Sequence, residues 1–300
     1  MKRTTIALLA PCLLACAQST PPAPAAAEPA PPAAPGPHVV IVTIDGLRPD
    51  AITEADTPAL ARLLREGASS RAALVPEPWL TLPSHFSMVT GQTPARHGIR
   101  SNKTRAQEPA NATLFTAAHD AGLRTALYFG KRKLLALAPR ASADVTLGPG
   151  PGDSNWHDGS SESLAARFAA DFPRERFALA LVHLREPDEA GHDAGWMTPA
   201  YRDALAQADR GLAVVLTAIA QSGLPTTVFL TSDHGGADKD HWTHGAVDWT
   251  VPWICVGPGV KAGAAIADAG IVDVGPTAAA VLGVTLPAVE GKVVKECLAN

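Results

Sequence analysis

Carboxylate and imidazole side chains recur in this chain directly after apolar runs. Asp45 follows the β-branched run at residues 39–42, and Gly46 behind it lacks a Cβ, which lets the backbone turn sharply. A single Asp-Gly pair is more often a turn whose aspartate bonds its own backbone. The recurrence of such residues indicates a site: Asp188, His192, Asp233 and His234 come soon after later apolar runs, and His244 completes the set.

Three carboxylates and three imidazoles, with no cysteine among them, suit borderline divalent cations such as Zn²⁺. Asp188 and His192 are four residues apart, so one helical turn would bring both side chains to one side. His244 precedes the apolar run at residues 251–256, and His241 is its nearby competitor. The set therefore predicts a site for two divalent metal ions, with Zn²⁺ as the expected metal.

Thr81 has a hydroxyl group that could act beside the predicted metal site. It stands before Pro83 and the helix-like run at residues 86–90, so it falls near a helix N-terminus, where free N–H groups favour an anion. A metal that coordinated its oxygen would lower the pKa of the hydroxyl and create a nucleophile. Taken alone, a threonine at such a position is more often a helix cap.

The elements that must position these residues alternate between strand-like and helix-like runs from residue 38 onward. This alternation predicts one α/β domain over residues 38–300, with a doubly wound, mostly parallel central sheet and helices on both faces. In such folds, ligands bind beyond the carboxyl ends of the strands. We expect strands at residues 39–42, 125–129, 177–184, 226–231 and 251–256, and helices at 57–67, 86–90, 114–122, 161–171, 201–222 and 276–282.

The ordered motifs resemble those of the alkaline phosphatase superfamily, and within it the nucleotide pyrophosphatase/phosphodiesterase branch. In chain order they are T-I-D-G-L-R-P-D, T-L-P-S-H-F-S-M-V-T-G, R-H-G-I, E-P-D-E-A-G-H, S-D-H-G and H-G. The resemblance covers essentially all of the chain from residue 38. It implies an alkaline-phosphatase-like core without a large cap domain.

The resemblance also implies a role for each motif residue. Thr81 would be the nucleophile that forms a phosphothreonine intermediate, and it would bridge toward the second zinc. Ser84 would contact substrate where the branch has an asparagine that helps to hold a phosphoryl oxygen. Sulfatases of the superfamily need a cysteine in place of Thr81, which argues against that activity. One zinc would be held by Asp188, His192 and His244, and the other by Asp45, Asp233 and His234.

Three functions follow from this pattern. The first is a phosphodiesterase or nucleotide pyrophosphatase, the second a phosphomonoesterase on the same scaffold, and the third a non-catalytic surface lipoprotein with a vestigial site. The doubly charged phosphoryl group of a monoester needs positively charged groups in addition to the two metals. Residues 79–84 contain no lysine or arginine. Residues 131–133, Lys-Arg-Lys, are expected to be a solvated basic turn. Four tryptophans could wall an apolar groove for a base or an aromatic leaving group: Trp79, Trp156, Trp196 and Trp242.

The amino terminus predicts export. Residues 1–16 have a basic start, an apolar core and a cysteine, Cys16, in a context that resembles a bacterial lipobox. The alternative is an ordinary secretory signal. We expect a lipid anchor at Cys16, a Pro/Ala-rich linker over residues 17–37 and a location in the cell envelope. A net charge of −4 gives no basic surface for nucleic acid, and Cys255 in an apolar strand is expected to be a buried thiol.

Overall fold

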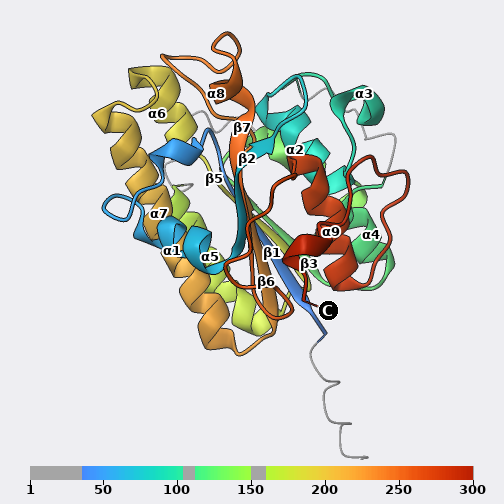
Figure 1. The fold of residues 1–300 in the computed structure, drawn as a ribbon. Helices are drawn as coiled ribbons and strands as arrows, with labels where there is room; N and C mark the ends of the chain where they lie inside the picture. The colour runs from blue at the N-terminus through green and yellow to red at the C-terminus, as the bar shows by residue number, and fades with distance from the viewer. Residues whose placement is uncertain (1–35, 104–111, 150–159, 300) are drawn as a thin grey trace, which may run out of the picture. The chain divides into compact units, whose positions relative to one another are not determined.

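A sheet of seven strands, in the order β2-β7-β6-β1-β5-β3-β4, runs through the described part of the chain (Figure 1). The computed structural model describes residues 36–103, 112–149 and 160–299. The strands are β1 His38–Ile44, β2 Ala68–Leu74, β3 Thr125–Phe129, β4 Val145–Leu147, β5 Leu179–Leu184, β6 Thr226–Thr231 and β7 Thr250–Val256. The five strands from β6 to β4 pair in parallel, whereas β7 is antiparallel to both of its neighbours.

The central strand is β1, which is buried along its whole length. It pairs with β5 on one side and with β6 on the other, so that Val40 is level with Ala180 and Val228. A parallel strand in this position is covered on both faces, which explains why residues 39–42 are apolar without alternation. The carboxyl ends of β1, β5 and β6 consequently meet at one edge of the sheet.

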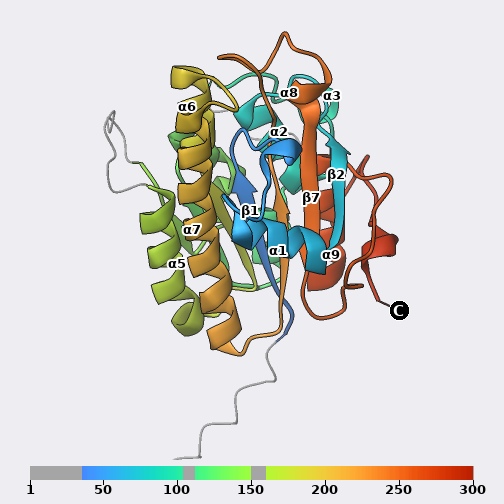
Figure 2. The ribbon, with the colours of Figure 1, turned by 60° about the vertical axis from the view of Figure 1, so that its left-hand side comes forward.

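Helices cover both faces of the sheet (Figure 2). One face packs against α1, α5 and α7 and buries Phe168 and Leu212, while the other packs against α2, α4 and α9 and buries Phe86 and Leu114. In Figure 1, α6, α2 and α8 lie at the upper end of the sheet. The helices are α1 Pro58–Glu66, α2 Thr81–Thr90, α3 Pro94–His97, α4 Leu114–Asp120, α5 Ser161–Glu175, α6 Glu186–Ala194, α7 Pro199–Ser222, α8 Ala246–Trp249 and α9 Val274–Leu282.

The predicted fold class is confirmed, and the strands expected at 125–129 and 226–231 match residue for residue. Strand β2 was missed because its sequence, ASSRAAL, contains no β-branched or aromatic residue. Residues 35–300 form one compact unit. The predicted leader with Cys16 lies outside the described residues, as does nearly all of the linker.

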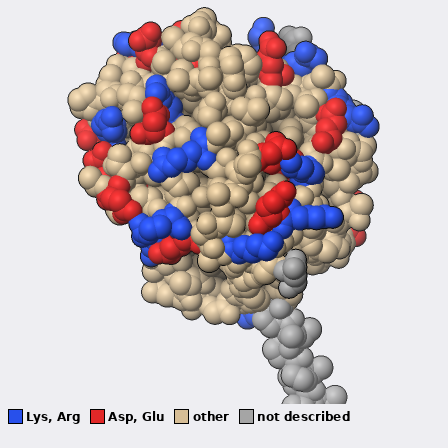
Figure 3. All heavy atoms as spheres, viewed as in Figure 1, with Lys and Arg blue, Asp and Glu red and all other residues tan. Residues whose placement is uncertain are grey.

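The buried thiol expected at residue 255, the surface charge and the helix lengths can each be compared with the structure. Cys255 is buried in β7, as expected, and both it and Cys297 are free thiols. On the face shown in Figure 3, lysine and arginine side chains are interspersed with aspartate and glutamate. Within the described ranges, no helix is both long enough and apolar enough to cross a membrane.

Candidate metal centre

Three buried carboxylates lie together at the carboxyl ends of the central strands. Asp45 directly follows β1, Asp233 follows β6 by two residues, and Asp188 lies in the first turn of α6, which follows β5. Gly46 between these elements has φ +70°, and a Cβ built on it would lie 3.1 Å from the Asp188 Cα. Glycine is required here because the turn after β1 needs both a left-handed backbone and this close approach.

The imidazole of His234 faces all three carboxylates. Its Nδ1–H donates to the Gly235 carbonyl at 2.9 Å, so its Nε2 carries a lone pair. That Nε2 lies 3.4 Å from Asp45 Oδ1, 3.4 Å from Asp233 Oδ2 and 3.6 Å from Asp188 Oδ1. None of these four buried atoms has a hydrogen-bond partner among the described residues. Each unpaired buried acceptor costs about 1–3 kcal/mol, so these four lone-pair-bearing atoms fit the role of ligands to divalent cations.

His241 lies against the same cluster. Its ring stacks on that of His234 with centroids 3.6 Å apart, and its Nδ1–H donates to the Trp79 carbonyl at 3.1 Å. Burial, followed by the nearby His234, lowers the pKa of His241 to about 3, so the ring is neutral with its Nε2 lone pair available. His241, His234 and Asp188 make a second group of potential metal ligands, beside Asp45, Asp233 and His234.

The two other predicted histidines differ in their placement. His192 Nε2 lies 3.4 Å from Asp188 Oδ1, and the attraction of this carboxylate for the protonated ring raises the pKa of His192. His244 instead faces Asp240 and Asp248, at 3.3 and 3.5 Å from its Nδ1. The structure thus brings together five of the six predicted carboxylate and imidazole ligands, and it places His241 rather than His244 beside them.

Thr81 is the first residue of α2 and is buried, while Leu80 occupies the N-cap position. Thr81 is therefore not the helix cap that the sequence alone would favour. His85 ties this turn to the metal ligands, because its Nδ1–H donates to the Thr81 carbonyl at 2.7 Å and lies 3.8 Å from Asp233 Oδ2. Ser84, predicted to contact substrate, is fully buried, and its Oγ has no partner among the described residues.

The sequence analysis missed Asn102, which lies beside the first turn of α2. Its Oδ1 accepts a hydrogen bond from the Leu82 N–H at 2.9 Å. An asparagine amide also carries two N–H donors, so this residue brings a donor group to the neighbourhood of Thr81. The available signal was its position soon after the R-H-G-I motif, in a segment without regular structure.

Lys131 was also missed, and the expectation of a solvated basic turn is wrong for it. It follows β3, and its Nζ contacts Oδ2 of both Asp45, at 2.7 Å, and Asp188. Only 14% of its side chain is exposed. Burial alone would lower the pKa of Lys131, but Asp45 and Asp188 outweigh it and raise the pKa well above its usual value. Arg132 beside it is exposed.

His183 is a third missed residue, hidden within the apolar strand β5. Its Nε2–H donates to Asp45 Oδ2 at 2.9 Å, and its Nδ1 accepts from the Gly130 N–H at 3.1 Å. The two bonds fix both the tautomer and the orientation of this fully buried ring. Outer partners of this kind orient metal-binding carboxylates, so His183 is placed to hold Asp45 toward His234.

The family of the chain follows from comparisons with known proteins. The family model for type I phosphodiesterase/nucleotide pyrophosphatase matches residues 39–251. The chain belongs to this family. Human ectonucleotide pyrophosphatase/phosphodiesterase family member 7 is 26% identical over 226 residues, which are 67% of this chain and 48% of that protein. The chain thus spans between about a quarter and about half of the length of the curated relatives that it matches.

Two solved structures show the same fold. Murine ectonucleotide pyrophosphatase/phosphodiesterase 5, solved as an inactive threonine-to-alanine variant in complex with AMP, has a TM-score of 0.71 at 16% identity; the match covers 87% of this chain and all of that one. A 2-O GAG sulfatase has a TM-score of 0.70 at 17% identity, covering 86% and 73% of the two chains. At these identities the likeness concerns the fold alone.

Three of the four tryptophans expected to wall a groove lie in the described part of this phosphodiesterase-family chain, and their surroundings differ. Trp196 is buried and donates its Nε1–H to the Gly46 carbonyl at 2.9 Å, so it supports the turn after β1. Trp79 packs on Trp249 with ring centroids 4.7 Å apart. Trp242 is 54% exposed and lies 4.8 Å from the His241 ring, so it is open to a leaving group. Trp156 lies outside the described residues.

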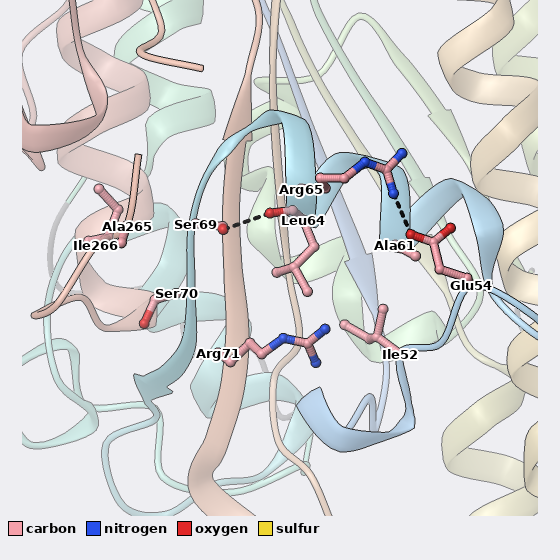
Figure 4. A pocket seen from close by; sticks show the side chains of 10 residues that line it. All are labelled: Ile52, Glu54, Ala61, Leu64, Arg65, Ser69, Ser70, Arg71, Ala265 and Ile266. Carbon is pink, nitrogen blue, oxygen red and sulfur yellow. Dashed lines mark hydrogen bonds and ion pairs between the residues drawn. The ribbon is translucent and has the colours of Figure 1, made fainter. Parts of the chain in front are cut away.

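A separate surface pocket of about 580 Å³ lies between α1 and β2 (Figure 4). Its charged groups are already engaged, because Arg65 pairs with Glu54 and the Arg71 guanidinium donates to the Pro49 carbonyl. None of the predicted ligands lines it. The metal centre at the strand ends is therefore the stronger candidate for catalysis.

Proposed function

We propose that this protein is a zinc-dependent hydrolase of phosphate esters that cleaves phosphodiester or nucleotide pyrophosphate bonds. The proposal rests on four buried atoms that carry lone pairs and have no hydrogen-bond partner among the described residues: His234 Nε2 and one carboxylate oxygen from each of the three aspartates around it. They lie next to the helix that begins at Thr81. Membership of the type I phosphodiesterase/nucleotide pyrophosphatase family supports the phosphodiester chemistry. A vestigial site would have no need to keep four potential metal-ligand atoms close together and without hydrogen-bond partners.

The donor set indicates which residues would hold the metals. Asp45, Asp233 and His234 would bind one ion, and Asp188 would bind the other together with His192 and either His241 or His244. Oxygen and imidazole ligands without cysteine fit Zn²⁺. When bound, the ions supply Lewis-acid stabilisation of the phosphoryl oxygens and lower the pKa of the Thr81 hydroxyl.

Residues of the chain would make and break the bonds in two steps. Thr81 Oγ1 would give its proton to water and attack phosphorus. The bond from phosphorus to the leaving oxygen would break, and the leaving oxygen would keep the electron pair and take up a proton from water. Water then cleaves the resulting phosphothreonine and returns Thr81 to its hydroxyl form. Asn102, beside Leu82, would donate its amide N–H to a phosphoryl oxygen. The inactive threonine variant of the murine relative, solved with AMP, supports both the nucleophile and a nucleotide substrate.

The site is tested with bis(p-nitrophenyl) phosphate as substrate. Protein stripped with a chelator should not release nitrophenol, and activity should return when Zn²⁺ is restored. Magnesium and calcium serve as controls, because hard cations match the imidazole ligands poorly. Full activity in the stripped protein, or no activity at any metal loading, would contradict the proposal.

We also propose that the protein is exported and anchored by lipid at Cys16. The support is the order of basic start, apolar core and cysteine within residues 1–16. Replacing Cys16 by serine should move the protein from the membrane fraction to the soluble fraction or leave an unprocessed precursor. Equal fractionation of the two forms would show that the lipobox assignment is mistaken.

A further inference from the structure

Lys131 places a fixed positive charge inside the candidate metal centre. Its ammonium contacts the Oδ2 atoms of Asp45 and Asp188, whereas the Oδ1 atoms of both carboxylates face His234 without a hydrogen-bond partner. On each of the two carboxylates, Lys131 therefore contacts one oxygen, and the other oxygen stays available to a metal ion. A metal bound by the unpaired donors would not have to displace the lysine.

The charge of the site depends on this lysine. Burial, followed by the nearby Asp45, raises the pKa of Asp233 to about 7. With metal ions bound, all three carboxylates would be ionised, so that Asp45, Asp188 and Asp233 would bring three negative charges and Lys131 one positive charge. With two divalent cations bound, the centre would have two net positive charges with the lysine and one without it. A phosphodiester carries one negative charge, and a phosphate monoester carries nearly two at neutral pH because its second pKa is about 6. The lysine thus matches the site to the monoester.

Residues 79–84 around Thr81 contain no lysine or arginine, which favoured a diester substrate. Lys131 comes from the end of β3 instead, and the pairing of β3 with β5 brings it to the site. Lys133 lies nearby, and burial together with the charge of Lys131 lowers its pKa. An ammonium has three N–H donors; two of them meet Asp45 and Asp188, which leaves one for a ligand.

We propose that Lys131 is a specificity-determining residue that donates to an oxygen of a dianionic phosphoryl group, so that this enzyme turns over phosphate monoesters in addition to the diesters of the proposed function. The inference rests on the proposed phosphate-ester hydrolase and names a substrate class for it. The competing role for Lys131 is purely internal: it would neutralise Asp45 and Asp188 and never contact substrate.

The first experiment compares p-nitrophenyl phosphate with bis(p-nitrophenyl) phosphate on zinc-loaded protein. Lys131→Met keeps the length of the apolar stem and removes the charge. It should lower kcat/KM for the monoester about 100-fold, the loss that follows removal of one preorganised donor to a transition state, and lower the diester value several-fold at most. Arg132→Met is the matched control, because it removes an exposed charge from the adjacent position; it should change neither value.

The second experiment measures inorganic phosphate binding by calorimetry and zinc content by elemental analysis. Lys131→Met should bind phosphate at least tenfold more weakly while keeping its zinc. An unchanged monoester-to-diester ratio with unchanged phosphate affinity would overturn the inference, as would equal loss of both activities together with loss of zinc. If the wild-type protein cleaves neither ester, the proposed function fails, and the phosphate affinities alone decide the role of Lys131.

Discussion

Replacing His183 by leucine tests whether the site depends on the partner that orients Asp45. The native ring is fully buried, donates to Asp45 Oδ2 at 2.9 Å and accepts from the Gly130 N–H at 3.1 Å. Leucine has a similar volume but neither a donor nor an acceptor. Asp45 Oδ2 would then keep only its contact with Lys131, and the Gly130 N–H would lose its acceptor.

Two independent estimates give the expected size of the effect. A hydrogen bond to a charged group contributes about 1.5–3 kcal/mol, which corresponds to roughly 10- to 150-fold in an equilibrium constant because about 1.4 kcal/mol is tenfold. Mutating outer-shell partners of metal ligands costs about 10- to 100-fold in metal affinity. We therefore expect His183→Leu to weaken zinc binding by about one to two orders of magnitude.

The assay is competition for Zn²⁺ against a chromogenic chelator, with two further variants. His183→Gln offers an amide N–H near the position of the native Nε2 and should recover much of the affinity. His97→Leu is the matched control, because His97 is equally buried but bonds Ser87 and the Ile99 N–H away from the ligands. The reasoning is refuted if His183→Leu binds zinc as tightly as the wild type, or if His97→Leu weakens binding equally.

The remaining predictions concern the nucleophile, the last ligand and the stability. Thr81→Ala should abolish diester turnover with zinc content unchanged, while Thr81→Ser keeps partial activity; equal rates in the alanine variant would exclude a covalent step. His241→Ala should lose zinc in elemental analysis and His244→Ala should keep it, and the reverse result would support His244, as the resemblance implies. Zinc at about 100 times its Kd should stabilise the fold by about 2.7 kcal/mol and raise Tm by roughly 5–10 °C, which calorimetry with and without chelator would measure.

The sequence predicted the site residues whose place follows from their position just after an apolar run. Asp45, Asp188 and Asp233 all come soon after apolar runs, and the carboxyl ends of parallel strands in one sheet meet at the same edge. The ends of β3 and β6 were predicted to the residue because Gly, Pro or polar clusters bound both runs. Strand β2 escaped because it depends on pairing with β7 rather than on its own composition.

The residues that were missed depend on strand order and on strand faces, which a single sequence does not contain. Lys131 reaches Asp188, 57 residues further along the chain, because β3 lies directly beside β5 in the sheet. His183 lies within an apolar strand, and only the register of β5 against β1, where it is level with Thr43, brings its ring to Asp45. His241 and His244 are three residues apart in a segment without a regular period, so spacing could not choose between them.

The position of Asp45 explains how one residue can serve both the metals and the lysine. It directly follows the central strand, so its neighbours come from β6 on one side and from β5 and β3 on the other. Oδ1 faces His234, while Oδ2 accepts from His183 and Lys131. Burial alone would raise the pKa of Asp45, but Lys131 and then His183 lower it well below its usual value. The carboxylate therefore stays charged without a metal, and its Oδ1 remains available to bind one.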